Sequence, residues 1–278
     1  MHNTYKIAIL DMNNGEPNEG MRCIKMLVGS FLACEGIKGN YDVFEVRNKT
    51  ELPSLNEYDI FISSGGPGSP LKTNAEWELQ YFGFLDALLH HNFTNPVKKH
   101  LFLICHSYQL ACLHWDIAKV TKRKSTSFGI TPIFKTKGGE TEPLFQGLDD
   151  PFYAVDSRDY QVLGPKEKKL DSVEGKILCK EKIRPHIPLK RAVMAIRFTK
   201  EIFGTQFHPE ADAEGMLRYF QKEEKQKIII KKYGKKKYHE MIEHLYDDDK
   251  ILKTHSAILP NFIKRAVNAL DKSKLELV

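Results

Sequence analysis

The chain has 278 residues, of which 41% are hydrophobic and 28% charged, and its formal net charge is +6. This composition is typical of a globular protein, and the length allows one large domain or one domain with an appendage. No apolar run approaches the ~18 residues that a membrane span needs, and the first apolar segment is interrupted by Lys6 and Asp11. We therefore expect neither a secretion signal nor a membrane segment.

The cysteines are five, an odd number, and no two of them form a Cys-x-x-Cys pair. This pattern argues against a disulfide framework and against a zinc ribbon, and it suits a reducing compartment. The histidines also lack the spacing of metal ligands. We expect a cytoplasmic protein that holds no metal.

The first hundred residues alternate between strand and helix patterns. The predicted strands are 5–12, 41–46, 58–63 and 101–105, and apolar residues recur at helical spacing over 21–35 and 76–91. This alternation predicts βαβ units, and hence a parallel sheet with helices on both faces. Ligands of such sheets bind beyond the carboxyl ends of the strands.

The middle of the chain has a different pattern. Short β-rich runs at 128–134, 152–155, 176–179 and 192–199 are separated by Gly, Pro and Lys turns, and a further strand covers 202–207. We expect these runs to add antiparallel structure to the parallel sheet. The predicted class is α/β, with a mostly parallel central sheet flanked by helices, an antiparallel β insertion and a helical C-terminal extension.

The chain after Asp212 is predicted to be helical. Helical patterns cover 214–233, 238–245 and 251–270, and Pro260 is expected to break or start the last helix. We predict a main domain over 1–212 and a basic helical extension over 213–278, whose closing helix packs on the main domain.

Most of the net charge lies in this extension. Residues 213–278 contain 15 basic and 10 acidic residues, whereas residues 1–212 contain 27 and 26. A basic segment can attract nucleic acid or an acidic partner, but interleaved aromatic residues are missing here. We favour a solvated helical surface, which offers a site for a partner protein or for self-association, and we do not expect nucleic-acid binding.

Cys105 lies where the apolar run 100–105 meets the helix-compatible stretch 107–113. An abrupt turn from strand to helix lifts a side chain clear of the sheet, and the positive end of the helix stabilises a thiolate. By itself, a Cys at a buried strand end is more often a small apolar side chain. Its neighbours in the fold decide between these two interpretations.

Two further segments favour a nucleophile. The glycine-rich loop 63–70 follows a strand and allows close approach of the backbone to a ligand. His208 and Glu210 end the strand 202–207 and can leave an extended backbone on one side. A Cys nucleophile needs a base, for which His208 is suited, and an anion that orients the base, for which Glu210 is suited.

In this order, the three motifs resemble those of class I glutamine amidotransferases, the glutaminase type found in GMP synthase, anthranilate synthase and carbamoyl phosphate synthetase. The family pattern is Ser-Gly-Gly-Pro-Gly, then Gly-x-Cys-x-Gly-x-Gln, then Gln-Phe-His-Pro-Glu. The segment 156–162 stands where the family commonly has Ser-His-Gly-Asp-x-Val. The resemblance covers roughly residues 5–212.

The resemblance implies a glutaminase with a Cys-His-Glu catalytic triad. Cys105 would attack the side-chain amide of glutamine, and His208, oriented by Glu210, would carry the proton. The backbone N–H groups of Gly66 and His106 would form the oxyanion hole. The substrate's amino-acid end would be held by the following residues: Gly68, Gln109, Ser157, Asp159 and Tyr160. No cofactor would be needed, and any ammonia acceptor would belong to a separate synthetase subunit.

Four residues depart from the family pattern. Leu103 and Ser107 replace glycines of the turn, His106 replaces an apolar or aromatic residue, and Asp159 replaces a glycine near the substrate. We expect the His106 side chain to lie on the surface or to line the pocket; a second proton carrier is the alternative. Asp159 motivates the alternative of a hydrolase for another γ-glutamyl compound. The altered turn motivates a non-catalytic binding protein.

Overall fold

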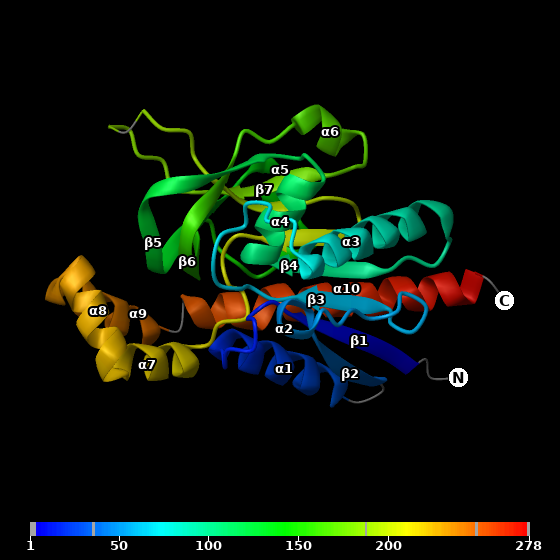
Figure 1. The fold of residues 1–278 in the computed structure, drawn as a ribbon, viewed down its shortest axis with the longest axis horizontal. Helices are drawn as coiled ribbons and strands as arrows, with labels where there is room; N and C mark the ends of the chain where they lie inside the picture. The colour runs from blue at the N-terminus through cyan, green and yellow to red at the C-terminus, as the bar shows by residue number, and fades with distance from the viewer. Residues whose placement is uncertain (1–3, 35–36, 187, 248–249, 277–278) are drawn as a thin grey trace.

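The computed structural model describes residues 4–34, 37–186, 188–247 and 250–276 (Figure 1). Within these residues, nine strands form one sheet in the order β2-β1-β3-β4-β9-β8-β7-β5-β6. The first five strands of that order are parallel, and the remaining pairings are antiparallel. The predicted α/β class is therefore confirmed. The strands are β1 (Thr4–Asp11), β2 (Lys38–Glu45), β3 (Ile60–Ser63), β4 (His100–Ile104), β5 (Lys119–Lys135), β6 (Phe152–Leu163), β7 (Lys176–Lys180), β8 (Val193–Arg197) and β9 (Ile202–Thr205).

Helices follow most of the strands. The predicted helix 21–35 is found as α1, which begins two residues earlier because the Asn18 side chain caps it by accepting from the Gly20 N–H; Glu35 lies outside the described residues. The helices of the main body are α1 (Glu19–Leu32), α2 (Val46–Lys49), α3 (Glu76–Thr94), α4 (His106–His114), α5 (Lys137–Glu140), α6 (Glu167–Asp171) and the 3₁₀ helix η1 (Pro143–Phe145). The helices of the extension are α7 (Ala213–Gln221), α8 (Glu223–Tyr233), α9 (Lys235–Leu245) and α10 (Ile251–Glu276).

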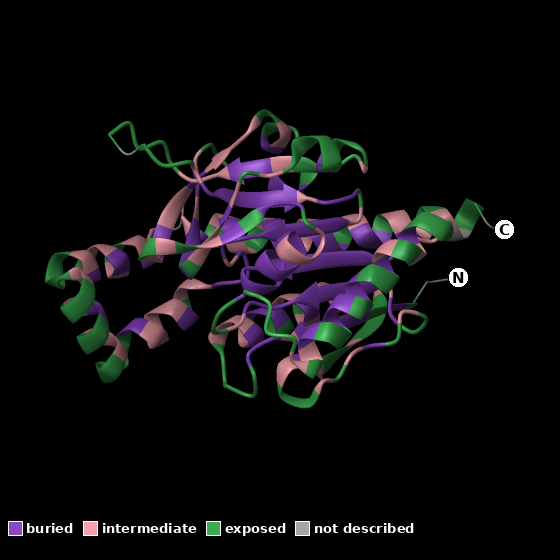
Figure 2. Cartoon of the chain, turned by 45° about the horizontal axis from the view of Figure 1, so that its top comes forward, coloured by how far each residue is buried: buried purple, intermediate pink, exposed green. Residues whose placement is uncertain are grey.

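The two faces of the sheet bury separate hydrophobic clusters. On β4, Phe102 points into the cluster that α1 and α10 cover, whereas Leu101 and Leu103 point into the cluster that α3 and α4 cover. This alternation follows from the two-residue period of a strand. Figure 2 shows the strands buried between these helical layers.

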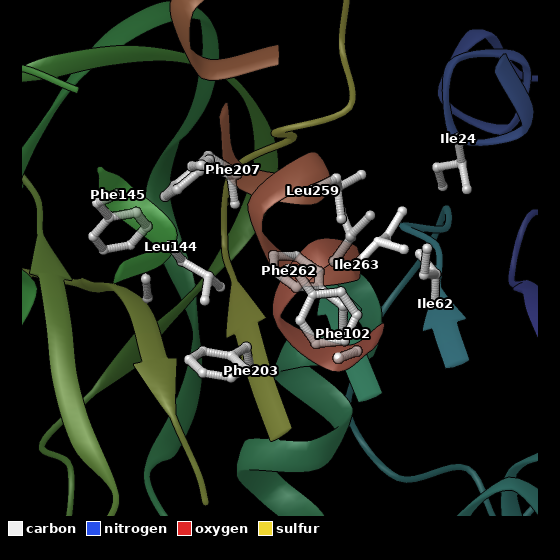
Figure 3. Packing of buried hydrophobic residues seen from close by; sticks show 14 of the residues in the cluster. Ile24, Ile62, Phe102, Leu144, Phe145, Phe203, Phe207, Leu259, Phe262 and Ile263 are labelled. Atoms are coloured by element: carbon white, nitrogen blue, oxygen red, sulfur yellow. The ribbon is translucent and has the colours of Figure 1, made fainter. Parts of the chain in front are cut away.

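Helix α10 closes the first cluster. Phe262 is 1% exposed, and its ring packs edge-on against Phe102 of β4 and Phe203 of β9, with centroids 5.2 and 6.1 Å apart (Figure 3). Pro260 lies inside the helix, so the predicted break is wrong. Buried side chains on both sides of Pro260, Leu259 and Phe262 among them, hold the helix on the sheet across the missing N–H.

The other helices of the extension form a smaller layer beside β5 and β6 (Figure 1). The predicted single helix 214–233 is wrong, since Lys222 is extended (φ −60°, ψ 122°) and separates α7 from α8. The break lets Phe220, Ile229 and Met241 enter one common cluster, which a straight 20-residue helix of about 30 Å could not achieve.

Candidate active site

Cys105 occupies the turn between β4 and α4. Its backbone has φ 47° and ψ −95°, a conformation that residues other than glycine rarely adopt. The turn is fixed on both sides, because the Cys105 N–H donates to the Thr205 carbonyl at 2.7 Å and its carbonyl accepts from the Gln109 N–H at 3.0 Å. Strained backbone held in this way is typical of functional sites.

His208 follows β9 and its ring is paired with Glu210. Nδ1 of His208 lies 2.8 Å from Oε1 of Glu210, whose side chain is 1% exposed. Burial disfavours a charged imidazole, but the charges of Glu210 and the Cys105 sulfur, together with side-chain hydrogen bonds to both, raise the pKa of His208 well above its usual range. The pair is therefore suited to accept and hold a proton.

Glu210 is enclosed by two elements from opposite ends of the chain. A β-carbon on Gly20, at the beginning of α1, would lie 3.0 Å from Oε1 of Glu210. The N-terminus of that helix favours a negative charge. On the other side, Nδ1 of His255 in α10 lies 2.8 Å from the Glu210 carbonyl oxygen. The backbone and side chain of Glu210 are thus both held in place.

Gly65 brings the glycine-rich loop against both catalytic candidates. A β-carbon on Gly65 would lie 2.8 Å from Cε1 of His208 and 3.5 Å from Cβ of Cys105. Because real Cβ atoms do not come that close to their neighbours, only glycine fits. Three segments that are distant in the sequence therefore meet at the carboxyl ends of β3, β4 and β9, where an α/β sheet places its ligands.

The loop itself is held by Arg47, which the sequence interpretation missed. Its Nη1 donates to the carbonyls of Pro67 at 2.6 Å and Met12 at 3.3 Å, and its guanidinium lies 5.0 Å from the Trp77 ring centroid. A β-carbon on Gly66 would lie 2.3 Å from the Met12 oxygen, so this position also requires glycine. The only sequence signal for Arg47 was its place just after a parallel strand.

The side chain of His106 is buried, with 2% of its surface exposed, so of the two predicted positions the surface one is wrong, and the position lining the pocket stays a prediction. Burial, and to a smaller degree the charge of Arg47, lowers the pKa of His106 to about 3. Its Nε2 has no hydrogen-bond partner among the described residues. Because the ring stays neutral at ordinary pH, it is a poor second proton carrier.

Gln109 is linked to Cys105 through Gln206, a residue that the sequence analysis does not predict to lie in the site. Nε2 of Gln109 donates to Oε1 of Gln206 at 3.0 Å, and Nε2 of Gln206 donates to the Cys105 sulfur at 3.6 Å. Gln206 is fully buried. It belongs to the same motif as His208, which is the signal that could have identified it.

Strand β6 brings one of the other predicted substrate residues, Ser157, to Cys105. The Cys105 sulfur lies 3.9 Å from the Ser157 carbonyl oxygen, and the His208 N–H donates to the Val155 carbonyl at 2.8 Å. Asp159 is exposed and Tyr160 is half-buried farther along the strand. Among the described residues, β6 is the last strand of the sheet. Gly68, with φ +89°, faces the exposed side of the loop after β3.

Comparison with known families decides the assignment. Residues 30–224 match the model of the family described as glutamine amidotransferase class-I. The chain belongs to this family. Its fold supports glutamine amidotransferase activity in general.

Solved structures of low sequence identity have the same fold. A glutamine amidotransferase from Thermotoga maritima is 16% identical, with a TM-score of 0.67 over 96% of this chain and 99% of that one. A Thermoplasma acidophilum protein assigned to GMP synthase, as one of its subunits, is 18% identical, with a TM-score of 0.53 over 76% and 87%. The glutaminase domain of Trypanosoma brucei CTPS with bound acivicin is 12% identical, with a TM-score of 0.51 over 74% and 86%.

A curated relative matches only locally. The polyhedrin of Spodoptera littoralis nuclear polyhedrosis virus is 27% identical over 85 residues, which are 30% of this chain and 34% of the polyhedrin. The chain thus spans about a third of that protein, and the match carries no functional argument.

Ser107, where the family pattern has glycine, is accommodated by polar contacts. Its hydroxyl donates to the Ser64 carbonyl at 2.6 Å and lies 2.8 Å from Oγ of Ser63. Oγ of Ser63 also lies 2.9 Å from the Tyr81 hydroxyl. The turn of this class I amidotransferase is therefore joined to the glycine-rich loop by buried hydroxyl groups.

Leu103, at the other glycine position, is fully buried in the cluster that α3 and α4 cover. It pairs in register with Gly204 of β9. A β-carbon on Gly204 would lie 2.5 Å from Cδ2 of Tyr108, so the Tyr108 ring occupies the space that this glycine leaves.

A buried charge network supports β6 from its inner side. Nε of Arg158 lies 2.9 Å from Oδ1 of Asp156, and its Nη2 lies 2.6 Å from Oε1 of Glu181. Arg123 also contacts Glu181, at 2.8 Å. The network holds the segment on both sides of Ser157, next to the Cys105 sulfur.

Neither a metal site nor a membrane span is found in the part of the chain that the structure describes. No group of three or more His, Cys, Asp or Glu residues there could hold a metal ion. No helix there is both long and apolar enough to cross a bilayer.

Proposed function

We propose that this chain is a glutaminase, which releases ammonia from the side-chain amide of glutamine through Cys105, His208 and Glu210. One observation carries the proposal. Gly65 packs against both Cys105 and His208, while Nδ1 of His208 lies 2.8 Å from a buried Glu210 oxygen. This arrangement gives a nucleophile, a base and an orienting anion in contact.

The reaction would proceed in two halves. The Cys105 sulfur attacks the amide carbon as its proton passes to His208, and the carbonyl electrons move to the oxygen. The C–N bond then breaks, His208 protonates the departing nitrogen, and a glutamyl thioester remains. Water attacks this thioester with His208 as the base, and the C–S bond breaks to give glutamate and the free thiol.

The N–H groups of Gly66 and His106 would stabilise the tetrahedral oxyanion. Arg47 and Met12 fix the loop at Gly66, and His106 is the first residue of α4, where helical N–H groups have no partner within the helix. Each such donor typically contributes about 3 kcal/mol of transition-state stabilisation. In this proposal Gly68, the Gln109 side chain and the β6 segment from Ser157 to Tyr160 hold the amino-acid end of the substrate.

A second candidate is a hydrolase for a different γ-glutamyl amide. The observation in its favour is Asp159, which stands where the family pattern has glycine. Its carboxylate is exposed, and it belongs to β6, the strand that contacts the Cys105 sulfur. The chemistry at Cys105 would be unchanged, and the substrate would carry a different end group.

If ammonia is the product, its acceptor would bind to a separate synthetase subunit. Two of the similar structures are a protein assigned to GMP synthase, as one of its subunits, and a glutaminase domain of CTPS, which supports this division of labour. The main domain over 1–212 would carry the glutaminase site in the cytoplasm. The extension over 213–278 would provide the surface for a partner or for a second copy of this chain.

The test compares ammonia release from glutamine with amine release from γ-glutamyl dipeptides. The variants are Cys105→Ala and, as the matched control, Cys34→Ala, which changes an exposed thiol. We expect Cys105→Ala to lose all activity and Cys34→Ala to keep it. Cleavage of dipeptides without release of ammonia from glutamine would select the second candidate.

Covalent labelling separates an enzyme from a binding protein. Acivicin, a glutamine-like electrophile, should modify Cys105, as located by mass spectrometry, and should leave Cys34 unmodified. If Cys34 reacts and Cys105 does not, the site is not that of a nucleophile, and a non-catalytic role is supported instead.

A further inference from the structure

The helical extension reaches the strand that contacts the Cys105 sulfur. Phe128 of β5 lies opposite Ser157 of β6, and its ring stacks on Tyr233 at the end of α8, with centroids 6.0 Å apart and planes 13° apart. Met241 of α9 packs beside it, with Cε 3.3 Å from where Gly129 would carry a β-carbon. The end of α8 is therefore anchored to β5, the strand that pairs with β6.

Next to this contact, a positive and a negative side chain, Lys232 and Asp159, lie close together. Nζ of Lys232, adjacent to Tyr233, donates to Oγ1 of Thr126 at 2.7 Å. The Thr126 hydroxyl in turn donates to Oδ1 of Asp159 at 2.6 Å. An ammonium from the extension and a carboxylate from the main sheet are thus joined through one hydroxyl group.

The spacing along β6 is within the reach of a glutamine whose amide lies at Cys105. Ser157 and Asp159 are two residues apart, so their side chains share a face and lie about 6.8 Å apart along the strand. The Ser157 carbonyl is 3.9 Å from the Cys105 sulfur. In glutamine, three bonds separate the amide carbon from the α-carbon, a reach of roughly 4 Å, and an amide carbon about to react lies roughly 3 Å from the sulfur. An amide at Cys105 therefore allows the α-carbon to lie near Asp159.

We propose that Lys232 and Asp159 bind the zwitterionic amino-acid end of the substrate. Lys232 receives the α-carboxylate and Asp159 receives the α-ammonium group, while Thr126 keeps the two apart at a fixed spacing. The helical extension thereby supplies a specificity-determining residue to the main domain. The inference rests on the proposed function, because it places the reacting amide at Cys105.

Binding measurements test this inference without turnover. In a Cys105→Ala background, titration calorimetry would measure the affinity for glutamine and for glutamine α-amide, which lacks the carboxylate. We expect Lys232→Met to weaken glutamine binding about fivefold, the scale of an exposed ion pair, and to leave the α-amide unaffected. Asp159→Asn should weaken the binding of both ligands.

The matched control is Lys231→Met, which removes an exposed charge of the same helix. It should change neither affinity. The inference is overturned if Lys232→Met and Lys231→Met behave alike, or if the Cys105→Ala protein binds neither ligand. Turnover is measured separately with Cys105 intact. Tight binding of glutamine without ammonia release would count against the proposed reaction and leave the Lys232 and Asp159 site standing.

Discussion

The Ser107 hydroxyl donates a hydrogen bond of 2.6 Å to the Ser64 carbonyl, and so joins the turn that carries Cys105 to the glycine-rich loop. Ser107→Gly, which restores the family residue, leaves this buried carbonyl without its donor. We expect a loss of about 1–2 kcal/mol in the free energy of unfolding, measured by urea denaturation. Ser172→Ala, which removes an exposed hydroxyl, should change it by less than about 0.5 kcal/mol. Equal effects would mean that the hydroxyl cluster does not stabilise the turn.

The raised pKa of His208 predicts that stability declines on the alkaline side. The folded chain holds this proton more tightly than the unfolded chain, whose His titrates near 6.5. This contribution is fully present below that pH and is lost as the pH rises through the folded pKa. Glu210→Gln removes the main raising charge and should flatten the decline, measured as unfolding free energy between pH 6 and 9. An exposed control, His90→Gln, should reproduce the wild-type slope.

Two buried histidines predict a loss of stability on the acid side. Burial lowers the pKa of His106 to about 3 and that of His100 to about 4, with smaller contributions from nearby Arg and Lys charges. The unfolded chain therefore binds these protons first, so the stability present above pH 6.5 is lost as the pH falls. Because one pKa unit corresponds to about 1.4 kcal/mol, each histidine accounts for a loss of about 3 kcal/mol between pH 6.5 and pH 4. His106→Gln should reduce the slope between pH 6.5 and 4, and an unchanged slope would contradict the assignment.

The buried charge network at β6 predicts that Arg158→Met greatly lowers the free energy of unfolding. The change leaves Asp156 buried without its partner, which typically costs 3–5 kcal/mol, or about a third of a domain's stability. Adding Asp156→Asn should recover part of this loss, as followed by urea denaturation. Lys227→Met, which breaks the exposed pair with Glu223, should cost less than about 1 kcal/mol. A cost for Arg158→Met as small as that would indicate that water reaches the network.

The parallel half of the fold could be predicted because each strand pattern there is local. Alternating apolar residues place Leu101 and Phe102 on opposite faces regardless of the rest of the chain. The extent of β6 could not be predicted in this way. Its polar run 156–161 resembles a loop, and its inward residues, Asp156 and Arg158, form an ion-paired network with distant residues: Arg123 from β5 and Glu181, the residue after β7.

In the candidate site, too, some residues could be predicted from local motifs and others could not. Cys105, His208 and the glycine-rich loop belong to motifs with their own chemical logic, and the structure brings them together. Arg47 and Gln206 act through contacts between distant segments, which no spacing in the sequence encodes. The burial of His106 depends likewise on the packing around α4.

The contact between Nδ1 of His255 and the Glu210 carbonyl has a consequence for how the chain is assembled. The backbone departs for α7 just after Glu210 and returns in α10 within hydrogen-bonding distance of the same residue. The segment between them is thus a cassette with adjoining ends. A short linker could replace it and still deliver α10 to the sheet, since loop length affects closure entropy only logarithmically. The nucleophile Cys105 and the segment that carries Lys232 would then be separable parts of one polypeptide.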